Sequence, residues 1–197
     1  DAIDVGFENN GDQEQTLKQF LKQNVSIYSA FKAHAKSKDV SDLLTDENGE
    51  LRSFNDFKND VKKLDETYDT NHLNAEYKLV VRSSRSAQQM INYQADADLY
   101  PNLEYMPSRA GTPREAHKKY YGLIRPINDP IWNKILPPNG WGCSCWFQNT
   151  DAEPNDLPKK LNNIDPIIAG NPVTEKVIIT KEHPAIKNTT KALRKNT

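Results

Sequence analysis

Two cysteines separated by a single serine are the most reactive pattern in this chain of 197 residues. Cys143 and Cys145 lie in the stretch Trp141-Gly142-Cys143-Ser144-Cys145-Trp146, and the chain contains no other cysteine. Two cysteines so close in sequence do not form a disulfide framework, so they must be interpreted as a local pair. Because thiolates are both zinc ligands and nucleophiles, metal binding and thiol chemistry are the two chemical hypotheses for this stretch.

The metal hypothesis depends on how the backbone turns at the cysteine pair. On a regular strand, residues two apart project about 6.6 Å apart, too far for two thiolates with Zn–S bonds of about 2.3 Å to one ion. The two neighbouring glycines would permit a turned backbone. His117 is the imidazole in this region and Asp129 a candidate fourth ligand. We expect no cofactor and two structural free thiols. The alternatives are zinc at His117, Cys143 and Cys145, and a strained disulfide.

A Cys–His nucleophilic pair is a further interpretation of the same residues. Such a pair needs an orienting third group, and Asn128 or Asp129 would supply it. Nothing in the spacing requires this arrangement, and a histidine on a short helix more often makes a structural hydrogen bond. The sequence also has no Gly-rich phosphate loop and no HExxH, GxSxG or EF-hand pattern. The sequence therefore favours a role other than catalysis.

The cysteines belong to a stretch, residues 98–150, in which prolines and glycines are too frequent for long helices. Short strands are predicted at residues 103–106 and 143–147. Thr112-Pro113-Arg114-Glu115 has the residue types of a helix N-terminus with Thr112 as its cap, so a short helix should follow and carry His117. We therefore expect a small module of short strands and one short helix.

Two tryptophans are predicted to anchor this module. Trp132 and Trp141 flank the turn Pro137-Pro138-Asn139-Gly140. We expect both rings to bury against that turn, because large aromatic side chains dominate the energetics of small cores.

The N-terminal half is predicted to be helical after a flexible beginning. Residues 1–15 are acidic and rich in Asn, Gln and Gly, as in a frayed terminus. The apolar spacing over residues 17–31 predicts one bent helix or two short ones. Ser53, with Asp56 three residues later, predicts the N-terminus of a further helix over residues 53–66.

Residues 71–97 contain no proline or glycine and are predicted to form the longest helix. Apolar residues recur at three-and-four spacing, so the face with Tyr77, Val81 and Met90 should point inward. A second face carries Lys78, Arg82, Arg85 and Gln89. A solvated surface is the favoured interpretation of that face, and a basic ridge is the alternative.

Charge is divided unevenly along the chain. The net charge is −6 over residues 1–70 and +5 over residues 71–197. This basic excess is small beside that of a dedicated DNA-binding domain, so we expect only weak, salt-sensitive, non-specific DNA contact. Residues 151–197 are polar, with one predicted strand at 173–180 and a basic tail that contains Lys187, Lys191, Arg194 and Lys195. No apolar run approaches the about 20 residues of a membrane span, so no membrane partner is expected.

An ordered series of short motifs runs through residues 71–147. It begins with Asn71-His72-Leu73-Asn74-Ala75-Glu76-Tyr77 and Tyr100-Pro101-Asn102-Leu103-Glu104-Tyr105. It continues through Arg114, His117, Gly122, Pro126, Asp129, Trp132 and the run Pro137-Pro138-Asn139-Gly140-Trp141-Gly142-Cys143-Ser144-Cys145. In this order and at these separations, the series resembles the phage Mu F-like minor head proteins of tailed bacteriophages, the head morphogenesis family. Its structural motif residues are Tyr105, Arg114, Asp129, Trp132, Pro138 and Trp141.

The resemblance implies a structural protein of a phage or prophage head. Such proteins lie in the virion interior, contact the portal or other head proteins near packaged DNA, and occupy the bacterial host cytoplasm during assembly. The family usually has Cys-Arg-Cys where this chain has Cys143-Ser144-Cys145, and an Asp and Arg where it has residues 108–112, so a family charge role does not transfer at these points. The alternative is a metal- or thiol-dependent enzyme, of toxin-associated type, that uses the His/Cys cluster.

The combined expectation is an α+β protein. A helical N-terminal half with a long central helix should precede the small Pro/Gly-rich module of short strands and a short helix. The expected parts are a flexible segment at 1–15, a helical region at 16–70, an F-like core at 71–150 and a polar extension at 151–197.

Overall fold

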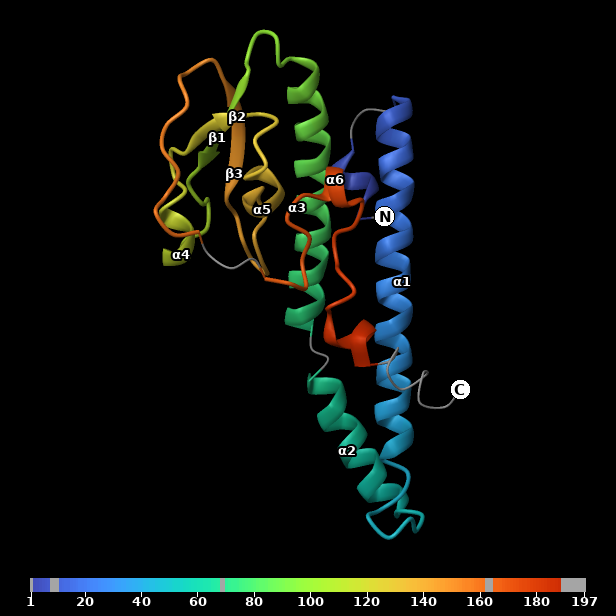
Figure 1. Cartoon of the computed structure of the whole chain (residues 1–197). Helices are drawn as coiled ribbons and strands as arrows, with labels where there is room; N and C mark the ends of the chain where they lie inside the picture. The colour runs from blue at the N-terminus through green and yellow to red at the C-terminus, as the bar shows by residue number, and fades with distance from the viewer. Residues whose placement is uncertain (1, 8–10, 68–69, 162–164, 189–197) are drawn as a thin grey trace.

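The computed structural model describes residues 2–7, 11–67, 70–161 and 165–188. Its elements are η1 (Asp4–Gly6), α1 (Asp12–Asp42), α2 (Phe54–Thr67), α3 (Thr70–Ala95), β1 (Asn102–Met106), α4 (Glu115–Lys118), β2 (Ile124–Pro126), α5 (Trp132–Ile135), β3 (Trp146–Thr150) and α6 (Pro172–Glu175). The long helix α3 stands between α1 on one side and the small sheet on the other (Figure 1). This arrangement confirms the predicted α+β class and its order along the chain.

Helix α1 is one continuous helix of 31 residues, where the sequence predicted a bent helix or two short ones. It is also longer than α3, which has 26 residues, so the prediction that the helix near Leu73 would be the longest is wrong. The polar residues in the middle of α1 did not interrupt it, because their helix propensities differ from that of alanine by at most about 0.7 kcal/mol each. Packing of Leu17, Leu21 and Tyr28, which are buried, compensates for that small loss.

Residues 2–7 are part of the core, so this part of the predicted flexible segment over residues 1–15 is packed. Ile3 and Phe7 are 1% and 6% exposed, and η1 between them packs on α3. The approach is so close that a Cβ atom on Gly6 would lie 2.2 Å from the Cβ of Ser84. The acidic, glycine-containing composition of these residues indicated disorder. Instead, the buried side chains of Ile3 and Phe7 and the close contact between Gly6 and Ser84 hold residues 2–7 against α3.

Helices α2 and α3 follow the sequence predictions in part. Ser53 caps α2 as predicted, since its Oγ accepts a hydrogen bond of 3.2 Å from the Asp56 N–H. In α3, Val81 and Met90 are buried as expected, but Tyr77 is 53% exposed, so its predicted inward position is wrong. Tyr77 lies in the first part of α3, before the stretch that both cores cover.

Two apolar clusters lie against different parts of α3. The first joins Leu79 and Ile91 of α3 to η1, α1 and the C-terminal segment. The second joins Met90 of α3 to the sheet and to the module that surrounds it, including Tyr105 and Trp132. The helix therefore connects the helical half of the molecule to the module that contains the cysteine pair.

The sheet has the order β2-β1-β3, and both strand pairs are antiparallel. Central strand β1 confirms the strand predicted at 103–106, and Leu103 lies opposite Arg125 on one side and Asn149 on the other. Strand β3 begins at Trp146, so the predicted strand at 143–147 is shifted along the chain. The cysteines themselves lie in the turn that precedes β3.

The C-terminal segment, residues 165–188, lies along α1 and α3 (Figure 1). The strand predicted at 173–180 is wrong: α6 occupies residues 172–175, and only an isolated bridge joins Ile168 to Ile179. Asn171 caps α6 by accepting from the Val173 N–H, and this Asn-Pro start outweighs the β-branched residues after it. Of the predicted basic tail, Lys191, Arg194 and Lys195 lie outside the described residues. Among the described helices, none combines the length and apolar character needed to cross a membrane.

Candidate functional site

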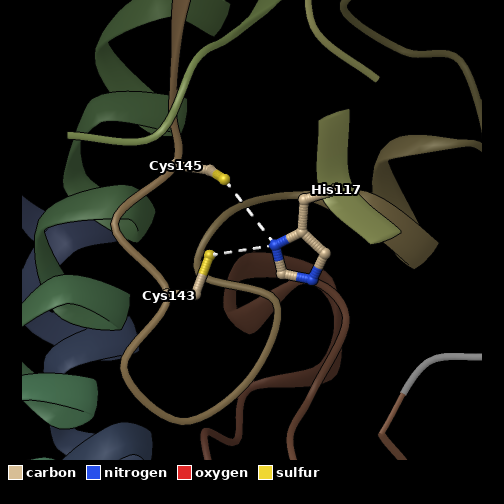
Figure 2. A group of neighbouring side chains, drawn as sticks. All are labelled: His117, Cys143 and Cys145. Atoms are coloured by element: carbon tan, nitrogen blue, oxygen red, sulfur yellow. Dashed lines mark hydrogen bonds between the residues drawn. The ribbon is translucent and has the colours of Figure 1, made fainter. Parts of the chain in front are cut away.

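His117, Cys143 and Cys145 meet inside the module (Figure 2). The Nδ1 atom of His117 lies 3.6 Å from Sγ of Cys143 and 3.7 Å from Sγ of Cys145. The three side chains are buried, and their ligand atoms all lie within 4.8 Å of one another. The predicted proximity of these three residues is therefore confirmed.

Short elements joined by turns bring the three residues together. His117 lies on α4, which begins at Glu115 with Arg114 in the N-cap position and without a side-chain cap, so the predicted Thr112 cap is wrong. On the other side, the Cys143 N–H donates to the Gly140 carbonyl at 3.1 Å. Gly142 has a φ of 72°, a conformation that other residues rarely adopt. This turn replaces the extended backbone that would keep the two sulfurs apart.

Residues of helix α3 and strand β1 make hydrogen bonds to the turn that contains the cysteines. Arg82 of α3 donates to the Cys143 carbonyl at 2.7 Å, and the Ser86 hydroxyl donates to the Pro137 carbonyl. The fully buried Tyr105 of β1 accepts a hydrogen bond of 3.1 Å from Asn139 through its hydroxyl. The cluster is thus positioned by long-range contacts as well as by its own turn.

The pKa values of the two thiols are shifted in opposite directions. The hydrogen bond from the Cys145 thiol, helped by His117, lowers the pKa of Cys143 despite its burial. The same hydrogen bond and burial raise the pKa of Cys145. Burial and the neighbouring Cys145 also raise the pKa of the Tyr105 hydroxyl. Of the two thiols, Cys143 is therefore the one that loses its proton more readily.

Asp129 and Trp132 form a structural corner beside the cluster. Asp129 accepts hydrogen bonds from Arg125 Nε at 2.8 Å and from the Ile131 N–H at 2.9 Å. Within the described residues, the group of His, Cys and acidic side chains that could hold a metal contains only His117 and the cysteines, so Asp129 does not provide the fourth ligand considered from the sequence. Trp132 is 1% exposed, as predicted, and its Nε1–H donates to the Pro126 carbonyl at 2.9 Å.

The remaining motif residues surround the turn before the cysteines. Pro138 is buried, and Arg114 donates to the Trp141 carbonyl while its guanidinium group lies over Gly140. Trp141 is only half-buried and packs against the first apolar cluster, with its ring edge-on to His183 at a centroid distance of 6.3 Å. Trp132 is therefore buried as predicted, whereas Trp141 is only partly buried.

A cleft of about 320 Å³ adjoins the cluster and is lined by three arginines, Arg82, Arg85 and Arg109, together with Ser144, Cys145 and Trp146 among others. The sequence identified Arg82 and Arg85 as one face of α3, but not Arg109. Arg109 stacks on Trp146, with its guanidinium carbon 4.1 Å from the ring centroid. Because this contact joins the loop after β1 to the start of β3, no periodicity within one element could reveal it.

Part of the chain is similar in sequence to two phage or prophage F proteins. Over 69 residues, 35% of this chain, it is 30% identical to a protein of Escherichia phage Mu provisionally named capsid assembly protein F. Over 63 residues, 32% of the chain, it is 38% identical to the Mu-like prophage FluMu F protein of Haemophilus influenzae. The matched stretches span 16% and 14% of the lengths of these relatives.

No family model matches the chain, and no solved structure matches it. The two relatives nevertheless confirm the resemblance that the ordered motifs indicated. About a third of this chain is homologous to the F proteins of phage Mu and of a Mu-like prophage.

Proposed function

We propose that this chain acts structurally in assembly of a phage or prophage head. The observation that carries this proposal is its homology, over about a third of its length, to a phage protein provisionally named for capsid assembly. The finer part of the proposal is that the chain lies in the virion interior, in contact with the portal or other head proteins. The resemblance of the ordered motifs to minor head proteins supports this part.

Removal of the gene tests the proposal. The coding sequence is deleted from the phage or prophage genome, and the wild-type chain is supplied from a plasmid as the control. We expect the deletion to reduce the yield of DNA-filled heads in electron micrographs and the infectious titre together, and the plasmid to restore both. Normal heads and normal titre without the chain would refute an assembly role.

We further propose weak, non-specific contact between the arginine-lined cleft and packaged DNA. Arg85 is exposed, and Arg82 and Arg109 line the same cleft, so three cations gather at one place that suits an anionic partner. Three phosphate contacts would give a slope of about −2.7 in log K against log salt, taking about −0.9 per contact. Two of these arginines are already engaged with Cys143 and Trp146, which keeps the affinity low.

Fluorescence anisotropy on a random-sequence duplex measures this contact. Arg85→Glu should weaken binding and flatten the salt slope, whereas the control Lys58→Glu, at an exposed cation of α2, should do so less. DNA binding that is independent of salt, or an equal loss of affinity in both variants, would show that the cleft is not the DNA contact.

A thiol-dependent enzyme is the second candidate function, and one observation favours it. The Cys143 sulfur lies 3.6 Å from the His117 imidazole nitrogen, and the lowered pKa of Cys143 favours its thiolate form. Burial of all three side chains restricts access of a substrate to this pair. Rapid, stoichiometric alkylation of Cys143 by iodoacetamide at neutral pH in the purified protein would favour the enzyme, and protection of the thiol would count against it.

A further inference from the structure

The cluster of His117, Cys143 and Cys145 has the composition of a zinc site. Two thiols and one imidazole are the side chains that zinc prefers in proteins, and all three are buried in one place. Carboxylate-binding metals such as calcium and magnesium prefer oxygen ligands, so this set does not suit them. The donor chemistry alone therefore selects a borderline-soft ion.

Two of the three distances between the donor atoms, those from the imidazole nitrogen to each sulfur, fit a single tetrahedral ion. Bonds of about 2.3 Å to sulfur and about 2.05 Å to nitrogen, at the tetrahedral angle, place a sulfur and a nitrogen about 3.6 Å apart. The structure has 3.6 Å from His117 Nδ1 to Cys143 Sγ and 3.7 Å to Cys145 Sγ. Both distances agree with that edge length within the about 0.2 Å used to judge a metal site.

Direct hydrogen bonding explains this geometry less completely. A ring nitrogen carries either one proton or one lone pair, so Nδ1 can make one well-directed hydrogen bond. Here it lies at nearly equal distances from two sulfurs (Figure 2). A cation shared by all three atoms would account for both distances at once.

A second set of polar groups supports the donor atoms. The Tyr105 hydroxyl accepts from Asn139 and lies beside Cys145, and Arg82 fixes the carbonyl of Cys143. The Tyr121 hydroxyl is buried and makes no hydrogen bond that meets geometric criteria in the described part of the chain. Groups such as the Tyr105 hydroxyl and Arg82 orient metal ligands in known sites.

We propose that His117, Cys143 and Cys145 bind one structural Zn²⁺, with a water molecule as the fourth donor. Both sulfurs coordinate as thiolates, so binding releases protons from the cysteines. The ion would join α4, a helix of four residues, to the turn before β3. This inference does not depend on the proposed role in head assembly.

The test is metal content of the full chain after expression in zinc-supplemented medium. We expect one zinc per chain in the wild type, and less than a tenth of that in Cys143→Ser, Cys145→Ser and His117→Gln. The control Ser144→Ala, which changes the residue between the two ligands, should retain the wild-type content. Zinc at wild-type stoichiometry in any ligand variant, or a metal-free wild type, would overturn the proposal.

Cobalt substitution of the wild type decides the question even if ligand variants fail to fold. Protein stripped with a chelator and reloaded with Co²⁺ should show thiolate-to-cobalt charge transfer and the intense visible bands of tetrahedral cobalt. Tyr105→Phe should weaken metal binding about 10–100-fold while keeping these bands, as expected for a positioning residue. A weak octahedral cobalt spectrum, or chelator treatment without effect on melting temperature, would contradict a structural zinc.

Discussion

Asn24 of α1 offers a sharp test of how the C-terminal segment is attached. Its side-chain oxygen accepts from the N–H groups of Ile178 and Ile179 at 2.9 and 3.0 Å, and its NH₂ donates to the Ile179 carbonyl at 2.8 Å. Both isoleucines are buried, at 1% exposure each. Asn24→Ala therefore leaves three backbone groups without their partner, in a place where water has limited access.

The size of the effect follows from these contacts. Three lost hydrogen bonds at about 1 kcal/mol each would reduce the free energy of unfolding by about 3 kcal/mol. Alanine has a higher helix propensity than asparagine, which offsets about 0.5 kcal/mol of this loss in the free energy of unfolding. We thus expect a net loss of about 2.5 kcal/mol.

Urea unfolding followed by circular dichroism measures the change, with Gln23→Ala as the control. Gln23 is the exposed neighbour on the same helix, so its substitution should change stability by no more than about 0.5 kcal/mol. Equal, small effects of both substitutions would mean that the C-terminal segment is not held by Asn24.

Three further predictions concern burial, close packing and protonation. Trp132→Ala should reduce the free energy of unfolding by about 3–5 kcal/mol, since the ring is almost fully buried, and a loss below about 1 kcal/mol in urea unfolding would be incompatible with that burial. Gly6→Val should lower the melting temperature because its side chain would collide with Ser84, and an unchanged melting temperature would show that η1 does not pack there. Burial lowers the pKa of His183, so the unfolded chain binds its proton first and stability should fall as the pH drops below about 6.5. His183→Gln should reduce this fall in stability, and the substitution of exposed His34 by Gln should preserve it. Identical profiles of stability against pH for the wild type and both variants would show that His183 is not the cause.

Local residue chemistry predicted the elements whose signals lie within a few residues. The Ser53 cap and the strand at residues 103–106 were predictable because a cap and an alternating apolar strand are short-range patterns. The His117–cysteine cluster was predictable because both motifs belong to one small module with a single apolar cluster.

Contacts between distant segments account for what the sequence did not predict. The close approach of Gly6 to Ser84 and the contact of Asn24 with residues 178–179 each join segments more than 75 residues apart. The Asn171-Pro172 start of α6 did carry a local signal, but the β-branched residues after it favoured a strand. The Arg109–Trp146 stack had no signal within either element.

The most direct test of the central claim is quantitative mass spectrometry of purified phage heads. Heads, tails and free protein from an induced lysate are separated by density, and the heads are washed in high salt before digestion. A structural head protein should remain in the washed, DNA-filled heads at a constant ratio to the major capsid protein. Recovery of the chain only from the free-protein fraction, or only with tails, would contradict the account.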